Sequence, residues 1–195
     1  MSAKRPPVQM DIAAGAGLVA ANRFGPDHAS EDAGLVRLAC SGDESAFARL
    51  YDRYARMVHG LLVARVGQAD VEDLVQEVFL TAWRRLGALR DAAAFGGWLA
   101  AIARNRATDF HRRRHDSEAL PDHLAAPDAS SARFDALAVL AVIRTLPSAY
   151  RETLVLRLVE GMTGPEIAAQ TGLTAASVRV NLHRGMKLLR EKLEQ

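Results

Sequence analysis

The sequence predicts an all-α protein made of two small helical domains joined by a flexible acidic linker. Every periodic segment repeats its apolar residues at the three- and four-residue steps of a helix. No stretch alternates apolar and polar residues, and no Asn-Gly or Asp-Gly hairpin dipeptide occurs. Residues 115–133 contain two prolines and no apolar period, which predicts a linker between two helical units.

These features divide the 195 residues into four parts, and the length suits two small domains. Residues 1–34 are rich in glycine, alanine and proline without periodicity, so we expect a mobile N-terminal arm. Residues 35–114 form the first predicted domain and residues 134–195 the second. Residues 115–133 carry four acidic side chains against one arginine, which makes the predicted linker acidic.

Capping residues support the helices of the first domain, which are expected at about 32–40, 43–66, 70–87 and 94–114. Asp43 can cap the second of these helices, because its carboxylate can accept the free backbone N–H groups of the first turn. Asp70 can cap the third helix in the same way, with Asp73 at the third helical position.

In the second domain, helices are expected at about 132–145, 147–160, 163–170 and 174–193. Thr163 and Glu166 have the spacing of a capping box, and Pro165 falls in the first turn, where its missing N–H is not needed. Gly172 can adopt the left-handed conformation that ends a helix, and Thr174 can cap the next one. This segment therefore predicts a helix-turn-helix held together by Ile167, Leu173 and Val178.

The last predicted helix has a basic face and an apolar face. At about 100° per residue, the basic face collects Arg179, His183, Arg184, Lys187 and Arg190 together with the small Ala176. The opposite face collects Val178, Leu182, Gly185, Leu189 and Leu193. Such a helix can enter the major groove of DNA, where arginine can pair with guanine. The alternative is a solvated basic face on an ordinary bundle.

The predicted helix at 70–87 also has two faces. Its core stripe comprises Val71, Leu74, Val75, Val78, Phe79, Ala82 and Leu86. The other face comprises Asp73, Gln76, Glu77, Leu80 and Arg84. An apolar residue surrounded by charges is typical of a docking surface for another protein. The alternative is an ordinary exposed face that happens to contain one leucine.

A third candidate surface lies on the predicted helix at 94–114. One side carries Trp98, Ala101, Asn105, Thr108 and Arg112, and another carries Leu99, Ile102, Ala103, Arg106 and Phe110. Aromatic side chains can stack on unpaired bases and cations can follow the phosphate backbone, so the first side suits strand-separated DNA. The alternative is that Trp98 belongs to the core.

The composition favours a binding protein over an enzyme. There is no phosphate-cradling glycine loop and no HExxH motif, so we expect neither a catalytic site nor a cofactor. His111 and His115 lie four residues apart, but a third ligand is missing and adjacent arginines oppose a cation, so no metal site is expected. The net charge of +2 is small, but five of the residues at 104–115 are basic and only one is acidic.

The expected location is the cytoplasm. Cys40 is the single cysteine and cannot form an internal disulfide, which favours a reducing compartment. No run approaches the about 18 apolar residues that a membrane span requires, so no membrane insertion is expected. The small apolar stretch at 13–21 lacks the leucine-rich centre of a signal peptide.

Four ordered motifs resemble bacterial RNA polymerase sigma factors of the sigma-70 family. They are residues 70–83, residues 95–105, residues 146–156 and the helix-turn-helix at 166–179. The short two-domain form is similar to the extracytoplasmic-function (ECF) group. The resemblance implies a region 2-like bundle at 35–114 and a region 4-like helix-turn-helix domain at 134–195.

The resemblance also implies partners and site residues. Core RNA polymerase would be bound through the clamp helices of its largest subunit by Asp73, Gln76, Glu77, Leu80 and Arg84. The −10 element of promoter DNA would be bound by Trp98, Asn105, Thr108 and Arg112, with the loop at 86–97 capturing a flipped base. The −35 element would be bound by Ser177, Arg179, His183, Arg184 and Lys187. The linker would enter the channel and flap region of polymerase, and an anti-sigma factor is an expected further partner.

We therefore expect a sigma factor, not an enzyme, that places core polymerase on promoters and assists melting at −10. One alternative is a two-domain helix-turn-helix repressor or activator that never docks on polymerase. Such a protein has no need for the charged face that runs from Asp73 to Arg84 around Leu80. A second alternative is an adaptor that binds only proteins, which the basic face of the last helix disfavours.

Overall fold

The computed structural model describes residues 28–117 and 131–194, and every regular element in these two ranges is helical. The all-α prediction is therefore confirmed. The elements are α1 (His28–Cys40), α2 (Glu44–Val63), η1 (Gln68–Asp70), α3 (Val71–Arg85), η2 (Leu86–Ala88), η3 (Ala92–Ala94), α4 (Phe95–Ser117), α5 (Ser131–Arg144), α6 (Ser148–Leu158), α7 (Gly164–Thr171) and α8 (Ala175–Leu193).

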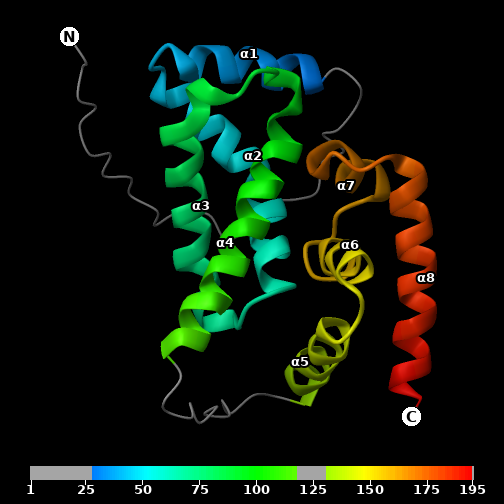
Figure 1. Ribbon diagram of the computed structural model, residues 1–195. Helices are drawn as coiled ribbons and strands as arrows, with labels where there is room; N and C mark the ends of the chain where they lie inside the picture. The colour runs from blue at the N-terminus through cyan, green and yellow to red at the C-terminus, as the bar shows by residue number, and fades with distance from the viewer. Residues whose placement is uncertain (1–27, 118–130, 195) are drawn as a thin grey trace.

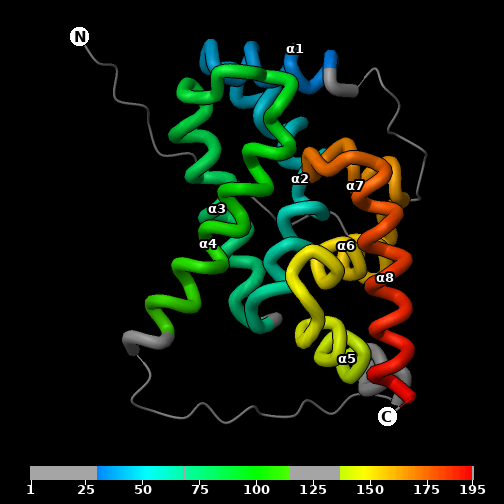
Figure 2. Tube along the Cα trace, turned by 45° about the vertical axis from the view of Figure 1, so that its right-hand side comes forward, coloured from blue at the N-terminus to red at the C-terminus, as the bar shows by residue number. Residues whose placement is uncertain are grey.

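The helices form two units that lie side by side (Figure 1). Helices α1 to α4 make the N-terminal unit, and α5 to α8 make the C-terminal unit. Helix α6 contacts α2, and helix α7 contacts both α2 and α4. Helix α8 lies on the outer side of α6 and α7, away from the N-terminal unit, in both views (Figures 1 and 2). Helix α8 therefore forms one outer side of the molecule, and helices of the N-terminal unit form the opposite side.

Apolar side chains from α2, α3 and α4 make the core of the N-terminal unit. The seven residues of the predicted core stripe on α3 and η2 are all buried: Val71, Leu74, Val75, Val78, Phe79, Ala82 and Leu86. Aromatic rings join α2 to α3, with centroids 4.8 Å apart between Phe47 and Trp83 and 4.5 Å apart between Tyr51 and Phe79. The periodicity of this helix thus predicted its buried face correctly.

The two aspartates expected to cap helices behave differently. The carboxylate of Asp43 accepts the backbone N–H groups of Ser45 and Ala46 at 2.9 and 3.1 Å, as predicted. Asp70 makes no capping hydrogen bond, and that prediction is wrong. Asp70 ends the short helix η1 with a helical backbone, whereas a capping residue is normally extended. Its carboxylate instead lies 3.7 Å from Arg114 in α4.

The structure also differs from the predicted arm and linker at their edges. Residues 28–34 of the predicted arm are helical and belong to α1, whereas residues 1–27 lie outside the described residues. Asp32 anchors this helix because its buried carboxylate accepts the Tyr54 hydroxyl at 2.6 Å and pairs with Arg53. In the predicted linker, α4 continues to Ser117 and α5 begins at Ser131, and residues 118–130 lie outside the described residues.

A buried carboxylate joins the two units. Glu152 of α6 is 7% exposed and accepts the Nε–H groups of Arg65 and Arg104, each at 3.0 Å. Arg65 follows α2 and Arg104 lies on α4, so both partners come from the N-terminal unit. Arg144 of α5 adds a hydrogen bond from its Nε to the carbonyl of Val63 at 3.0 Å. A buried charge needs such partners, so the C-terminal unit is held where both arginines can reach it.

A histidine lies at the same junction. Nδ1 of His59 in α2 is 2.7 Å from Oε1 of Glu160, which follows α6, and Nε2 is 3.7 Å from Glu72 in α3. The hydrogen bond to Glu160 raises the pKa of His59, and the negative charges of Glu160 and Glu72 add to that effect against the opposing effect of burial. Protonated His59 is therefore favoured when the two units are docked.

This raised pKa predicts a pH dependence of stability. A group whose pKa is higher in the folded chain stabilises it fully below its unfolded pKa of about 6.5, and loses that contribution as pH rises through the folded pKa. We expect His59→Gln to lose more stability at about pH 6 than at about pH 8. The difference should stay below about 1 kcal/mol, because a third of the side chain is solvent-exposed. Urea unfolding of the original chain and of the His59→Gln variant at both pH values measures the loss of stability. An equal loss at about pH 6 and at about pH 8 would contradict the prediction.

Candidate DNA and protein interfaces

The helix-turn-helix forms through the local interactions that its sequence predicts. The hydroxyl of Thr163 accepts the N–H of Glu166, and the Glu166 carboxylate accepts the N–H of Thr163, which completes the capping box. Gly172 has φ +74°, the left-handed conformation expected at the end of α7. Thr174 then caps α8 by accepting the N–H of Ser177 at 3.1 Å. The turn is thus fixed by hydrogen bonds and a backbone conformation within residues 163–177.

Packing against α6 and α7 sets the rotation of α8. Val178 and Leu189 are buried, and Ile167 of α7 is fully buried beside them. Gly185 allows α8 to approach α6 closely, since a Cβ there would lie 3.1 Å from Leu154. These contacts turn the predicted apolar face inward, although Leu193 near the end of the helix is half exposed.

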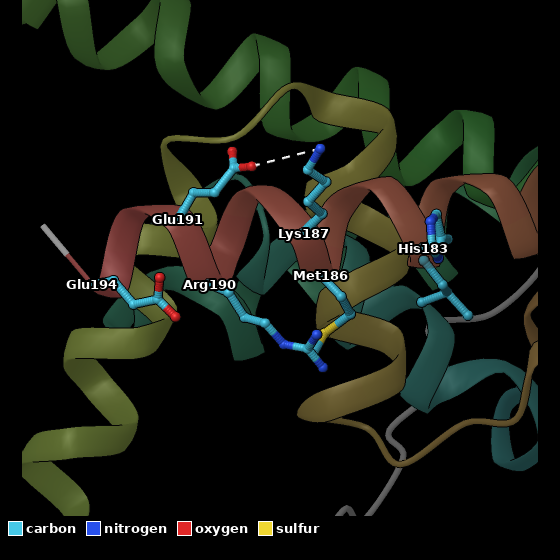
Figure 3. Close-up of a pocket in the computed structure, with 7 residues that line it drawn as sticks. His183, Met186, Lys187, Arg190, Glu191 and Glu194 are labelled. Carbon is cyan, nitrogen blue, oxygen red and sulfur yellow. Dashed lines mark ion pairs between the residues drawn. The ribbon is translucent and has the colours of Figure 1, made fainter.

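Helix α8 lies at the outer edge of the molecule (Figure 1), and its basic side chains are exposed. The five residues predicted to bind the −35 element are all exposed: Ser177, Arg179, His183, Arg184 and Lys187. Figure 3 shows Lys187 reaching toward Glu191, 3.9 Å away, with Arg190 along the same helix. A shallow hollow of about 640 Å³ beside this part of α8 is lined by Leu182, His183, Met186, Lys187, Arg190, Glu191 and Glu194. The acidic residues Glu191 and Glu194 lie toward the C-terminal end, so all five residues predicted to bind the −35 element precede them.

The charged face of α3 is exposed at four of its five predicted positions. Asp73, Gln76, Leu80 and Arg84 are exposed, and the Leu80 side chain retains 48% of its accessible surface. Glu77 differs, because its carboxylate turns toward α4. An exposed leucine surrounded by charged residues fits the protein-docking surface expected on this helix.

Glu77 links α3 to α4. Its Oε2 lies 3.5 Å from Nη1 of Arg106 and 3.9 Å from Nη2 of Arg113. Arg106 also donates from Nη2 to the hydroxyl of Thr81 at 2.9 Å. Glu77 is therefore engaged within the protein while its neighbours on α3 face solvent. We use the name Leu80 surface below for the four exposed residues Asp73, Gln76, Leu80 and Arg84.

The third candidate surface lies on α4. Asn105, Thr108 and Arg112 are exposed on one side of the helix, as predicted. Trp98 is half buried, with its ring centroid 5.9 Å from that of Phe95, so it packs on the core and still presents an edge to solvent. Arg112 pairs weakly with Asp109 at 3.1 Å while remaining largely exposed. The exposed side thus offers an amide, a hydroxyl and a cation in one row.

Sequence reasoning missed the residues that join the two units. Glu152, Arg65 and Arg104 were not singled out, because no local pattern pairs residues 87 and 48 positions apart. The one available signal was a charged residue two positions before the apolar run at 154–156 of a short helix. Buried glutamate is rare without a partner, so that position pointed to a cation elsewhere in the fold.

The structure also bears on the predictions that the chain has no metal site and no membrane-spanning segment. Nε2 of His111 donates to the carbonyl of Arg65 at 2.8 Å, so this histidine has a structural role. Within residues 28–117 and 131–194, no group of three or more His, Cys, Asp and Glu side chains is placed to hold a metal ion. None of the helices in these ranges is both long and apolar enough to cross a bilayer.

Comparison with known proteins gives two family matches. Sigma-70 region 2 matches residues 50–116, and Sigma-70, region 4 matches residues 136–189. RNA polymerase sigma factor CarQ of Myxococcus xanthus is 36% identical over 160 residues, covering 78% of this chain and 91% of CarQ. RNA polymerase sigma factor NccH of Alcaligenes xylosoxydans xylosoxydans is 30% identical over 178 residues, covering 85% of this chain and 96% of NccH.

Solved structures show the same fold. CnrH, in complex with the cytosolic domain of CnrY, is 27% identical with a TM-score of 0.59, covering 84% of this chain and 97% of CnrH. The sigma factor RpoE of Bartonella quintana, in complex with the anti-sigma factor NepR, has a TM-score of 0.54 at 21% identity. The RpoE match covers 76% of this chain and 96% of RpoE. It supports the fold alone.

The exposed face of α8 predicts how duplex DNA binding responds to salt. Arg179→Ala and Arg184→Ala should each weaken binding to duplex DNA. The slope of log affinity against log salt concentration should fall by about 1 for each phosphate contact removed. The melting temperature should stay unchanged, because both side chains are exposed. Fluorescence anisotropy over a salt series measures the slope, with Lys192→Ala near the end of the helix as the control. An unchanged slope in both arginine variants would show that this face does not bind DNA.

Proposed function

The chain belongs to the sigma-70 family of RNA polymerase sigma factors, in its extracytoplasmic-function group, and we propose how its residues divide that family's task. It binds core RNA polymerase and directs the enzyme to specific promoters, where transcription starts. Sigma factors are non-catalytic regulators, and we propose no catalytic activity for this chain. We place its action in the cytoplasm, because polymerase and its promoters are there.

We propose that the Leu80 surface docks on the clamp helices of the largest polymerase subunit. The observation that carries this assignment is the exposure of Leu80 among Asp73, Gln76 and Arg84. An apolar centre with a charged rim is the anatomy of a protein interface. Glu77 belongs to the same face of α3, and its carboxylate is held by the arginines of α4.

The two DNA elements are assigned to different units. We propose that the basic face of α8 binds the −35 element as a duplex, with Arg179 and Arg184 reaching bases or phosphates. We propose that the exposed side of α4 and the loop at 86–97 bind the −10 element after its strands separate. Melting would be driven by tighter binding of flipped bases than of stacked bases, so no nucleotide hydrolysis is required.

A repressor or activator that never touches polymerase is not favoured. The chain matches both the region 2 and the region 4 families, and region 2 carries the Leu80 surface. An adaptor that binds only proteins is also disfavoured, because the exposed basic face of α8 has the form of a DNA-reading helix.

Two further partners belong to the proposal. The acidic residues at 116–133 suit the basic channel and flap region of polymerase, where an acidic segment can replace a nucleic-acid backbone. An anti-sigma factor is the other expected partner. This expectation rests on the family resemblance, and the related sigma factor structure of CnrH, 27% identical to this chain, is a complex with the cytosolic domain of CnrY.

Run-off transcription tests the function as a whole. Purified core polymerase is incubated with and without the chain on a pool of linear DNA templates whose upstream region is randomised. Transcripts that start at one defined position on a subset of templates are expected only when the chain is present. The selected templates should share two elements, one upstream of the other. An unchanged transcript pattern would contradict the function.

The Leu80 surface is tested by a charge. Leu80→Asp should weaken binding to core polymerase by roughly 2–4 kcal/mol, because an unpaired carboxylate would be buried in the interface. The melting temperature should stay close to that of the original chain, since Leu80 is already half exposed. Leu38→Asp on α1 is the matched control, because Leu38 is 50% exposed and lies outside the proposed surface. Equal affinity of both variants for core polymerase would remove the assignment.

The α4 assignment is tested separately from the α8 assignment. Asn105→Ala should slow promoter opening without weakening binding to a duplex −35 element. On a template with a pre-melted −10 bubble, part of the defect should disappear, because the unpairing that the side chain assists has already occurred. Permanganate footprinting of the open complex measures the effect. If Asn105→Ala and Arg179→Ala reduce duplex −35 binding equally, the division between the helices is wrong.

A further inference from the structure

Four arginines lie together where the ends of α2 and α5 meet α4 and α6, and we call them the arginine cluster. Arg65 and Arg104 donate to the carboxylate of Glu152 through their Nε–H groups, each at 3.0 Å. Arg144 ends α5 and Arg151 lies on α6, and neither has a carboxylate partner among the described residues. The cluster therefore carries four positive charges against the one negative charge of Glu152.

Backbone carbonyl groups hold the two arginines that have no carboxylate partner. Nε of Arg144 donates to the carbonyl oxygen of Val63 at 3.0 Å, and Nη1 of Arg151 donates to the carbonyl oxygen of Arg144, also at 3.0 Å. These bonds fix the position of both guanidinium groups and neutralise neither charge. A group that is already held near its bound position loses little conformational freedom when a ligand arrives. Both arginines are therefore prepared to bind an anion.

The positive charges of the cluster are close enough to repel one another. Burial lowers the pKa of Arg144, and the charge of Arg151 lowers it further. Burial also lowers the pKa of Arg151, the charge of Arg65 adds to that effect, and Glu152 opposes it. Because arginine stays protonated in proteins, the folded chain retains this repulsion. An anion bound among the guanidinium groups would relieve it.

Two nitrogen atoms of the cluster are buried without a hydrogen-bond partner. They are Nη2 of Arg144 and Nε of Arg151, and neither has an acceptor in the described part of the chain. Buried N–H groups in native proteins are normally paired, because an unpaired one has lost its hydrogen bonds to water. Other atoms of both side chains are partly exposed, so a small shift of either side chain turns its unpaired donor toward a ligand. Both donors therefore indicate an acceptor from outside the chain.

The exposure of the cluster favours a small anion. The side chains of Arg65 and Arg104 keep 21% and 29% of their accessible surface, and Arg144 and Arg151 are also partly buried. Recessed cations from four chain segments suit a group that can enter between them better than they suit the wide surface of a DNA duplex. The planar guanidinium group can donate two parallel hydrogen bonds to phosphate oxygens, which makes arginine the usual residue for this purpose.

We propose that the arginine cluster binds the phosphoryl group of a small phosphorylated compound. Arg144 and Arg151 supply the unpaired donors, and Arg65 and Arg104 add positive charge while they remain bonded to Glu152. A phosphoryl group carries nearly two negative charges at neutral pH, so it offsets most of the excess charge of the cluster. The site belongs to the free chain and does not depend on the surfaces assigned to polymerase and promoter DNA.

Calorimetric titration of the free chain tests the site directly. Inorganic pyrophosphate, added at an ionic strength held constant with sodium chloride, should bind saturably with one pyrophosphate per chain. Adenosine diphosphate is titrated in the same way. Tighter binding of the nucleotide supports the proposal with a nucleotide as the ligand, and tighter binding of pyrophosphate supports it with phosphoryl groups alone as the ligand. No saturable binding of either compound would overturn the proposal.

Matched variants locate the bound pyrophosphate. Arg144→Met and Arg151→Met each remove one cation and keep a long side chain, and each should weaken pyrophosphate binding at least roughly tenfold. Arg49→Met is the control, because Arg49 is exposed on α2 outside the cluster, and it should bind like the original chain. Binding that neither variant of the cluster weakens would show that the phosphate lies elsewhere, and the proposal would be wrong.

Arg151→Lys distinguishes a hydrogen-bonded site from a diffuse positive field. Lysine keeps the charge but lacks the planar fork and the Nε donor, so pyrophosphate binding should still weaken at least roughly threefold. Undiminished binding would overturn the site. Melting curves by circular dichroism report whether each variant is folded. If a methionine variant does not fold, the lysine variant decides the question, since it preserves the charge at this position.

DNA is the other source of phosphate groups, and it is tested on the same variants. Arg144→Met should leave the affinity for duplex and for single-stranded DNA within about twofold of the original value, whereas Arg179→Ala on α8 should lower duplex affinity. If Arg144→Met weakens DNA binding and pyrophosphate does not bind the original chain, the cluster contacts nucleic acid and the proposal is wrong.

Discussion

The packing of the two helical units against each other depends on one buried carboxylate. Glu152 sits on the inner side of α6, where an unpaired charge would be strongly destabilising, and both of its partners belong to the other unit. Arg65 and Arg104 therefore determine where α6 can lie. With α6 held against α2, α7 comes to rest on the start of α4 and α8 is left on the outside.

That arrangement keeps the binding surfaces apart. The Leu80 surface is on α3 and the basic face is on α8, and these two helices lie at opposite sides of the molecule (Figure 1). Each is built on a helix whose inner face is fixed by a buried core, so its exposed residues can bind without refolding. A sigma factor has to contact polymerase and two DNA elements, and this separation lets each contact form independently.

The contacts between the two units include more charged groups than the core of either unit. Within each unit, aromatic and aliphatic side chains exclude solvent, as between Phe47 and Trp83. Between the units, the contacts include carboxylates, guanidinium groups, a histidine and glycine backbone. Leu156 of α6 also lies against Gly60 of α2, so apolar burial and paired charges together hold the two units in place.

The sequence alone determined the helices, the helix-turn-helix and the faces of α3 and α8, because these follow from interactions within a few residues. The capping box of Thr163 and Glu166, the left-handed Gly172 and the apolar period of α3 are all local. Only the tertiary structure decided which charged residues are engaged. Glu77 turns toward Arg106, and His59 meets a residue 101 positions away. Local sequence patterns do not indicate which side chains meet when they lie this far apart in the chain. The contacts between the two units therefore could not be predicted from the sequence.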